Sequence, residues 1–274
     1  MTTSADSCGV QQFALRGDTA LITGATGHLG REIATTLAAA GAHVLLNSRS
    51  AQHAEELAAA LRGKGLQATA APFDVADAGA IAAAVAQLRE RFERIDVLVN
   101  NAYTGRPATI ETSHFEDFQN AFAVAVAGPF TLLKELLPLL DASGACRRGG
   151  ASVINIASMY GHVSPDPAIY GSSGQNSAAF YGAAKGGLIQ LGRYLAVHLA
   201  PRNIRVNTIS PGPFPTPATV AKSPQFIAKL QQKNPLGRIG EAGELGGPVL
   251  FLASAASAYV TGVNLPVDGG WTCW

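Results

Sequence analysis

Among the six tyrosines of this chain, only Tyr181 is followed four residues later by a lysine, Lys185. On a helix, that spacing puts both side chains on one face. The pKa of tyrosine, about 10, is too high for efficient proton exchange at neutral pH, and a fixed ammonium group lowers it by favouring the phenolate. The pair therefore predicts Tyr181 as a general acid or base and Lys185 as the group that lowers its pKa. The alternative is a core ring beside the apolar stem of a lysine.

Ser158 is the third candidate for the chemistry. It directly follows a predicted strand at residues 152–157, on the edge where doubly wound sheets bind their ligands. A serine hydroxyl there can hydrogen-bond a substrate oxygen and stabilise charge as it develops. We expect Ser158 to orient the substrate, and a simple turn cap is the alternative.

A glycine-rich turn follows the first predicted strand. Residues 23–30 read TGATGHLG, and a helical pattern comes directly after them. Glycines allow a tight turn and a close approach of the backbone to pyrophosphate, and the free N–H groups of the following helix face the anion. The turn predicts dinucleotide binding, with an ordinary strand-to-helix connection as the alternative.

The residues after the second predicted strand indicate which dinucleotide is bound. An acidic side chain about 20 residues after the turn would accept hydrogen bonds from a ribose 2′-hydroxyl. This chain has Ser48, Arg49 and Ser50 instead, and Arg49 can form charge-assisted hydrogen bonds with a 2′-phosphate. We therefore predict NADP(H), with NAD(H) as the alternative if Arg49 is only a solvated loop charge.

These residues need a scaffold that brings them to one edge. From residue 20 onward, short apolar runs alternate with longer Ala-rich helical patterns, which indicates a parallel sheet with helices on both faces. We predict an α/β fold of the doubly wound (Rossmann) type, with a seven-stranded parallel sheet in a single domain. The strands are expected at 20–23, 43–47, 68–73, 97–100, 152–157, 204–210 and 263–267, and the helices at 31–40, 54–62, 80–91, 115–140 and 178–200.

Composition excludes several classes of function. The chain has 274 residues, 47% of them hydrophobic, and its 20 Lys+Arg and 19 Asp+Glu give a net charge of +1. Without basic runs, it has no electrostatic footprint for nucleic acid or an anionic membrane. The separated cysteines Cys8, Cys146 and Cys273 indicate neither a disulfide framework nor a metal site. We find no secretory signal and no apolar run long enough to span a bilayer, so we expect a cytoplasmic protein.

One polar segment interrupts the alternation of strands and helices. Residues 159–177 are rich in Ser, Gly, Pro, Asn and Gln, which predicts a long insertion between Ser158 and Tyr181. We expect a flexible tail at residues 1–16 and one catalytic domain at 17–274, with the insertion at the substrate site. Polar side chains of the insertion would suit a polyol or keto-sugar, unless they merely face water; they are Asp166, Tyr170, Ser172, Ser173, Gln175 and Asn176.

In their order and spacing, the motifs resemble the short-chain dehydrogenase/reductase family over residues 17–271, and its gluconate 5-dehydrogenase-like or sugar-modifying branch in particular. The resemblance rests on residues 23–30, 74–75 (DV), 100–102 (NNA), 181–185 (YGAAK), 207–212 (NTISPG), 260–262 (VTG) and 268–270 (DGG). It implies that the cofactor is bound by Gly24, Thr26, Gly27, His28, Leu29, Gly30, Ser48, Arg49, Asp74, Val75, Asn101, Ala102, Tyr181, Lys185, Pro211, Gly212 and Thr216.

The resemblance also implies the reaction. The nicotinamide would exchange hydride with a carbinol carbon while Tyr181 exchanges a proton with its oxygen, so a carbonyl and a secondary alcohol interconvert. The partner is then a small molecule, and a homodimer or homotetramer is expected. Two alternatives remain open: an NADP(H)-binding sensor or scaffold with weak turnover, and a sugar epimerase or dehydratase.

Several residues depart from the pattern of the family. His28 occupies a position where glycine is usual, and the resulting spacing matches branches with epimerases and dehydratases. Ala125 replaces an asparagine that usually completes a catalytic tetrad, and Tyr103 replaces a glycine after residues 100–102. Tyr170 lies at the usual distance from Ser158 but has no lysine four residues later, so it is expected to be a decoy for Tyr181.

Overall fold

Seven strands form one parallel sheet in the computed structural model, which describes residues 9–171 and 176–274. Their order is β3-β2-β1-β4-β5-β6-β7, so the topological switch point lies between β1 and β4. The strands are β1 (Thr19–Ile22), β2 (His43–Leu46), β3 (Ala68–Ala70), β4 (Val97–Asn100), β5 (Ala151–Ile156), β6 (Ile204–Pro211) and β7 (Asn264–Val267). This is the predicted doubly wound fold, although β3 ends earlier than expected.

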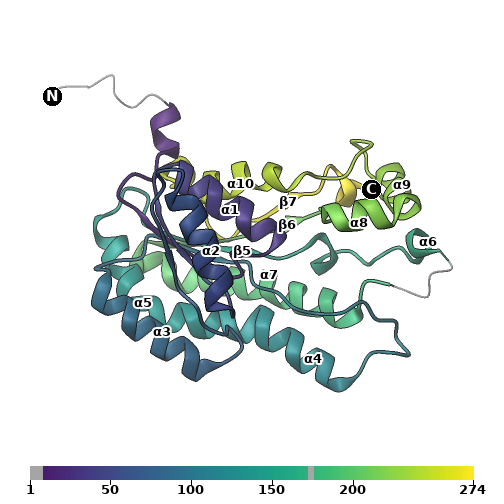
Figure 1. Ribbon diagram of the computed structural model, residues 1–274, viewed down its shortest axis with the longest axis horizontal. Coiled ribbons are helices and arrows are strands. Elements are labelled where there is room, and N and C mark those ends of the chain that lie inside the picture. The colour runs from purple at the N-terminus through teal and green to yellow at the C-terminus, as the bar shows by residue number, and fades with distance from the viewer. Residues whose placement is uncertain (1–8, 172–175) are drawn as a thin grey trace.

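Helices cover both faces of the sheet (Figure 1). Successive strand residues point to opposite faces, so Ile22 and Leu46 belong to one buried cluster, and Leu21 and Leu45 to the other. The first cluster is covered by α1 (His28–Ala39), α2 (Ala51–Arg62) and α10 (Gly246–Ala253), and the second by α3 (Ala78–Arg91), α5 (Gly128–Cys146) and α7 (Ala179–Leu199). Burial on both faces explains why the strands read as continuous apolar runs.

The predicted helix 115–140 is a long helical stretch with an irregular turn inside it. α4 (Phe115–Phe122) continues through a π-helical turn (Ala123–Ala127) into α5. By length and composition alone, the 32 residues of Phe115–Cys146 could cross a membrane, so the expectation that no such run exists is wrong. Half of its most apolar part is buried in the protein, and α5 packs on α3 and β5 as a core helix does.

The N-terminal segment contributes to the core. Gly9–Phe13 form a 3-10 helix, and Leu15 is fully buried in the cluster beneath α1. The backbone N–H of Leu15 donates a 2.9 Å hydrogen bond to the carbonyl oxygen of Ala40, at the end of that helix. The expected tail therefore does not extend over residues 9–16, and Cys8 lies outside the described residues.

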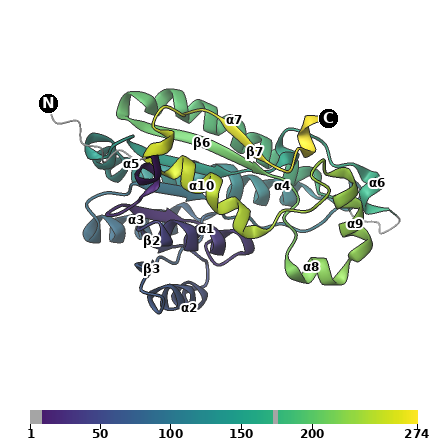
Figure 2. The same ribbon diagram turned by 90° about the horizontal axis from the view of Figure 1, so that it is seen from above.

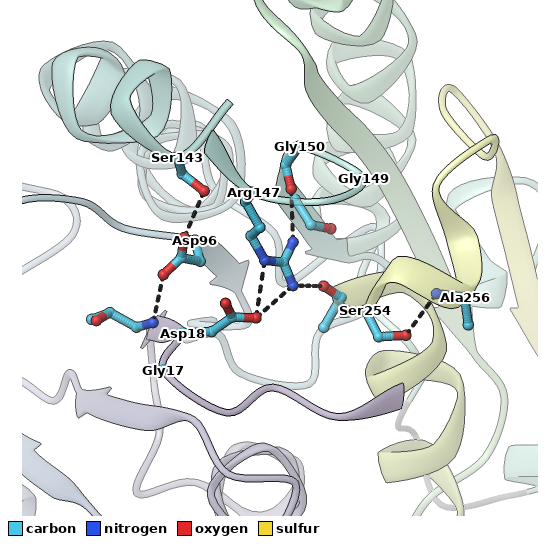
Figure 3. A network of polar contacts seen from close by, with 12 residues as sticks. Gly17, Asp18, Asp96, Ser143, Arg147, Gly149, Gly150, Ser254 and Ala256 are labelled. Atoms are coloured by element: carbon cyan, nitrogen blue, oxygen red, sulfur yellow. Dashed lines mark hydrogen bonds and ion pairs between the residues drawn. The ribbon is translucent and has the colours of Figure 1, made fainter. Parts of the chain in front are cut away.

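A buried polar network ties the chain together at the N-terminal edge of the sheet (Figure 3). The Arg147 guanidinium, at the end of α5, forms a 2.7 Å ion pair with Asp18, and their side chains are only 8% and 11% exposed. Asp96, just before β4, accepts 2.7 Å hydrogen bonds from the backbone N–H of Thr19 and the hydroxyl of Ser143. These contacts join the starts of β1 and β4 to α5, on the side opposite the predicted site.

At the carboxyl end of the sheet, the predicted insertion contains a short helix, α6 (Pro167–Tyr170), which lies beside α9 (Pro224–Lys233) in both ribbon views (Figures 1 and 2). The Lys233 ammonium forms a 2.6 Å ion pair with Asp166, and Lys229 donates a 3.0 Å hydrogen bond to the carbonyl oxygen of Ala168. We call this connection the α6–α9 clasp. Another short helix, α8 (Pro217–Lys222), directly precedes α9 in the chain.

Candidate active site

The glycine turn lines a cavity of about 340 Å³ at the carboxyl ends of β1 and β2, which we call the first cavity. α1 begins at His28, and its N-cap residue Gly27 offers no side chain, so the first N–H groups of the helix remain available to an anion. The lining residues are Gly24, Thr26, Gly27, His28, Leu29, Gly30, Asn47, Ser48, Arg49, Phe73, Asp74, Val75, Asn101, Ala102, Tyr103, Thr104 and Val124.

Two glycines of the turn cannot carry a side chain. Gly24 has φ +62°, a left-handed conformation, and a Cβ atom there would lie 2.8 Å from the Cα atom of Ala102. A Cβ atom on Gly30 would lie 2.2 Å from the carbonyl oxygen of Gly24. These positions keep the backbone of the turn packed closely against α1 and the segment after β4.

Asparagine side chains fix the turn from both sides. Asn101 donates 3.1 Å hydrogen bonds from Nδ2 to the carbonyl oxygens of Thr23 and Gly24. Directly after β2, Asn47 accepts a 3.3 Å hydrogen bond from the N–H of Gly24 through Oδ1. Asn101, predicted to bind cofactor, therefore also holds the shape of the turn, whereas sequence reasoning gave Asn47 no role.

Ser48 and Arg49 lie at the rim of the first cavity, directly after β2. The Thr26 hydroxyl donates a 3.2 Å hydrogen bond to Oγ of Ser48, which connects this rim to the glycine turn. Arg49 is exposed and takes part in none of the ion pairs among the described residues. A guanidinium without an ion-pair partner at the rim of this cavity is available to bind phosphate.

Ser158, Tyr181 and Lys185 lie together at the carboxyl end of β5. The Ser158 hydroxyl accepts a 3.1 Å hydrogen bond from the N–H of Tyr160, as a turn cap does, and it also interacts with the side chain of Tyr181. Nζ of Lys185 lies 5.9 Å from the centroid of the Tyr181 ring. The same Nζ atom donates a 2.7 Å hydrogen bond to the carbonyl oxygen of Ile156. Ser158 is 5% exposed and Lys185 is 3% exposed. The arrangement can exchange a proton at the Tyr181 hydroxyl with a ligand oxygen.

Burial dominates the proton affinities of this pair. Burial raises the pKa of Tyr181, and the interaction with the Ser158 hydroxyl opposes that change. Burial also lowers the pKa of Lys185 to about 7. The expected lowering of the Tyr181 pKa by Lys185 is not found in the free protein, because burial also disfavours the ammonium charge that would cause it.

A second cavity includes Tyr181 in its lining, whereas Ser158 and Lys185 line neither cavity. It is lined by Tyr103, Gly105, Arg106, Pro107, Tyr170, Asn176, Ser177, Ala178, Tyr181 and Phe226. Tyr170, expected to be only a decoy, shares this cavity with Tyr181, and its ring lies 5.7 Å from that of Phe226 in α9. Nothing in the sequence pattern indicates the contribution of Phe226, because α9 reaches the site only through the fold.

Several predicted residues lie outside both cavities. Pro211 ends β6, and the N–H of Gly212 donates a 3.0 Å hydrogen bond to the carbonyl oxygen of Val267 in β7. Thr216 is the N-cap residue of α8 and accepts a 3.2 Å hydrogen bond from the N–H of Thr219. Asp166 belongs to the α6–α9 clasp. Ser172, Ser173 and Gln175 lie outside the described residues.

The first cavity also contains residues that sequence reasoning did not assign to it as ligands. They are Asn47, Phe73, Tyr103, Thr104 and Val124. Tyr103 had a signal, because it stands where the family pattern has glycine. Val124 comes from the π-helical turn between α4 and α5, which also holds Ala125. Irregular turns of this kind inside helices are frequent at functional sites.

Comparisons with known proteins agree with this geometry. The sequence model of a family described as enoyl-(acyl carrier protein) reductase matches residues 24–272. A rhamnolipids biosynthesis 3-oxoacyl-(acyl-carrier-protein) reductase of Pseudomonas aeruginosa is 37% identical over 94% of this chain and 98% of its own length. A 5-keto-D-gluconate 5-reductase of Escherichia coli is 35% identical over 94% of this chain and 96% of its own length.

Solved structures give the same result. A gluconate 5-dehydrogenase from Burkholderia cenocepacia, in complex with NADP and tartrate, superimposes with a TM-score of 0.87 at 33% identity. The match covers 97% of this chain and 100% of that one. The similarity therefore extends over the sheet, both cavities and the C-terminal segment.

Proposed function

Since the chain belongs to the short-chain dehydrogenase/reductase family, and similar members of it are named as reductases, we propose that it interconverts a carbonyl and a secondary alcohol with NADP(H) as cofactor. The juxtaposition of Ser158, Tyr181 and Lys185, with Tyr181 in the lining of the second cavity, carries this proposal. The first cavity offers the backbone N–H groups of the glycine turn and the Arg49 guanidinium to a dinucleotide. The second cavity exposes the Tyr181 side chain to a substrate.

The residues of the first cavity fit a phosphorylated dinucleotide. The uncapped start of α1 offers N–H groups to pyrophosphate, and the glycines at 24 and 30 leave no side chain in the way. Arg49 and Ser48 lie where the adenosine ribose would follow, and their donors favour a 2′-phosphate. Similar chains have been solved with NADP. NAD(H) is the alternative if Arg49 is only a solvated loop charge.

A bound nicotinamide supplies or accepts the hydride. In the direction of reduction, Tyr181 donates its phenolic proton to the carbonyl oxygen as that oxygen gains charge. The Ser158 hydroxyl interacts with the Tyr181 side chain and can hold the same oxygen. Lys185 lies close enough to stabilise the Tyr181 phenolate once its own charge is supported.

A polyol or keto-sugar is the substrate class that we propose. Asn176 and Ser177 bring polar groups to the second cavity, and the gluconate-type names of several relatives support this class. The aromatic side chains of Tyr103, Tyr170 and Phe226 give the same cavity apolar walls, and one relative is named as a 3-oxoacyl reductase. A 3-oxoacyl thioester is therefore the second candidate substrate.

A homo-oligomer is also part of the proposal. Large apolar side chains are exposed on the outer surfaces of the long helices: Phe115, Phe118, Phe122 and Phe130 on α4 and α5, and Tyr194 and Val197 on α7. Exposed apolar groups gathered on neighbouring helices favour a protein interface. We expect sedimentation at micromolar concentration to give a dimer or tetramer, and a monomer would contradict this.

The decisive experiment follows the absorbance of NADPH with a panel of keto-sugars, 3-oxoacyl thioesters and simple apolar ketones. We expect turnover with the keto-sugars, loss of turnover in Tyr181→Phe, and unchanged NADPH binding by fluorescence in that variant. Activity restricted to apolar ketones would rule out the polyol proposal. Tight NADPH binding without turnover of any carbonyl would instead support a sensor or scaffold.

A further inference from the structure

Tyr103 stands between the two cavities. Among the described residues, it is the only one that lines both of them. It follows the asparagines at the end of β4, in a position from which its ring reaches toward α7. A side chain at this junction contacts the groups that any ligand spanning the two cavities must meet.

The ring of Tyr103 contacts both members of the proton-transfer pair. Nζ of Lys185 lies over the ring, 5.0 Å from its centroid. The ring of Tyr181 packs against it edge to face, with centroids 4.9 Å apart and an angle of 69° between the planes. The negative face of an aromatic ring attracts an ammonium group, most strongly where water is excluded.

Lys185 needs such support. It is almost fully buried and belongs to none of the ion pairs among the described residues. Its hydrogen bond to the carbonyl oxygen of Ile156 uses one of its three donors. The rings of Tyr103 and Tyr181 are the other polarisable groups at the ammonium, and the Tyr103 ring is the nearer of the two, at 5.0 Å against 5.9 Å.

The hydroxyl group of Tyr103 has no part in these contacts. Its oxygen is buried and has no hydrogen-bond partner among the described residues. It lies against Gly105, where a Cβ atom would be only 2.5 Å away. The ring packs on a cluster of small side chains that includes Ala121, Ala125 and Ala184. The contacts of Tyr103 with Lys185 and Tyr181 are therefore made by its ring and not by its hydroxyl group.

We propose that Tyr103 is a positioning residue, whose ring face holds the ammonium of Lys185 and whose contact with Tyr181 orients that phenol at the junction of the cavities. The proposal rests on the proposed function, because it assigns Tyr103 to the same pair. The other titratable groups that act on these side chains are Tyr160 and Tyr170, on the segment after β5, and Asp117, on α4.

The first test needs no turnover. Lysine carrying ¹³C at Cε is incorporated into the full-length protein, and the resonance of Lys185 is identified by its loss in Lys185→Met. Tyr103→Phe keeps the ring face, whereas Tyr103→Leu keeps apolar bulk without it. We expect the NMR titration midpoint of Lys185 to fall by roughly one pH unit in Tyr103→Leu and to stay in place in Tyr103→Phe.

Tyr103→Met serves as a second apolar variant if the leucine variant does not fold. An unchanged midpoint in both apolar variants, or an equal change in Tyr103→Phe, would overturn the proposal. Because this readout is a titration, it decides the role of Tyr103 even if no carbonyl in the panel is reduced. The proposed function would then fail alone.

Kinetics give a second, independent readout. In Tyr103→Leu we expect kcat to fall by about tenfold, with a smaller change in the KM for NADPH, since the ring acts on the proton-transfer pair. Tyr103→Phe should retain the wild-type kcat. A loss of kcat in Tyr103→Phe would show that the hydroxyl is the working group and would contradict the proposal.

Discussion

The Lys185 ammonium donates a 2.7 Å hydrogen bond to the carbonyl oxygen of Ile156, the last residue of β5. This lysine of α7 is thus anchored on the strand that leads to Ser158. Two groups of the proposed mechanism, which are far apart in sequence, are fixed to one strand end. This anchor keeps the lysine inside the protein, where its charge is costly.

The first prediction concerns that cost. Burial lowers the pKa of Lys185 from its ordinary 10.5 to about 7. Between these values the unfolded chain holds a proton that the folded protein lacks, so this group makes stability rise with pH from about 7 to 10.5. In Lys185→Met this rise should disappear, as measured by urea unfolding across the interval. Lys134→Met, an exposed site on α5, should retain it.

The second prediction concerns the cofactor. Removal of the guanidinium in Arg49→Ala should raise the KM for NADPH by roughly ten- to a hundredfold, because charge-assisted hydrogen bonds to phosphate are lost. The KM for NADH should change little. Arg193→Ala removes an exposed charge on α7 and controls for net charge. Equal effects on both cofactors, or wild-type preference for NADH, would contradict the assignment of Arg49.

The third prediction separates two glycines of the turn. In Gly30→Ala the new Cβ atom would lie 2.2 Å from the carbonyl oxygen of Gly24 and 2.8 Å from Nδ2 of Asn101. The turn cannot keep its shape, so NADPH binding measured by fluorescence should be lost. In Gly27→Ala the nearest atom would be 3.3 Å away, which a small shift relieves. Tight NADPH binding by Gly30→Ala would show that the turn is not the phosphate site.

The fourth prediction concerns the ion pair at the opposite edge. Arg147→Met leaves the carboxylate of Asp18 buried without its partner and should lower the free energy of unfolding by about 3 kcal/mol. The exposed pair of Arg202 and Asp141 is the matched control, since Arg202→Met should cost less than about 1 kcal/mol. Turnover per folded molecule should be unchanged in both variants. Similar losses of stability in the two would contradict the role of burial.

The sheet could be predicted because its strands obey a simple rule. Strands covered on both faces are apolar throughout, so runs such as the one around Val99 or Ile154 stand out from the Ala-rich helices. The glycine turn was equally readable, because backbone geometry demands glycine at Gly24 and Gly30. α8, α9 and α10 were not predicted. The α6–α9 clasp depends on contacts between segments that only the fold brings together.

The electrostatics of the site could not be predicted from spacing. The four-residue interval correctly placed Tyr181 and Lys185 together, but the interval says nothing about burial, which acts in opposite directions on a phenol and an amine. The contact of Tyr103 with Lys185 was also invisible, since it joins a loop after β4 to a helix that begins more than 70 residues later. Only the folded structure shows that the Tyr103 ring lies beside the Lys185 ammonium.

Part of the second cavity, including Tyr170 and Phe226, comes from a stretch of the chain that the first cavity does not use. All lining of the first comes from between Gly24 and Val124, whereas the α6–α9 clasp lies between Asp166 and Lys233. A chimera that takes residues 166–233 from a relative would therefore change part of the wall of the second cavity and leave the lining of the first unchanged. Cofactor preference and substrate preference can therefore change separately, provided that Tyr103, which lines both cavities, remains compatible with each.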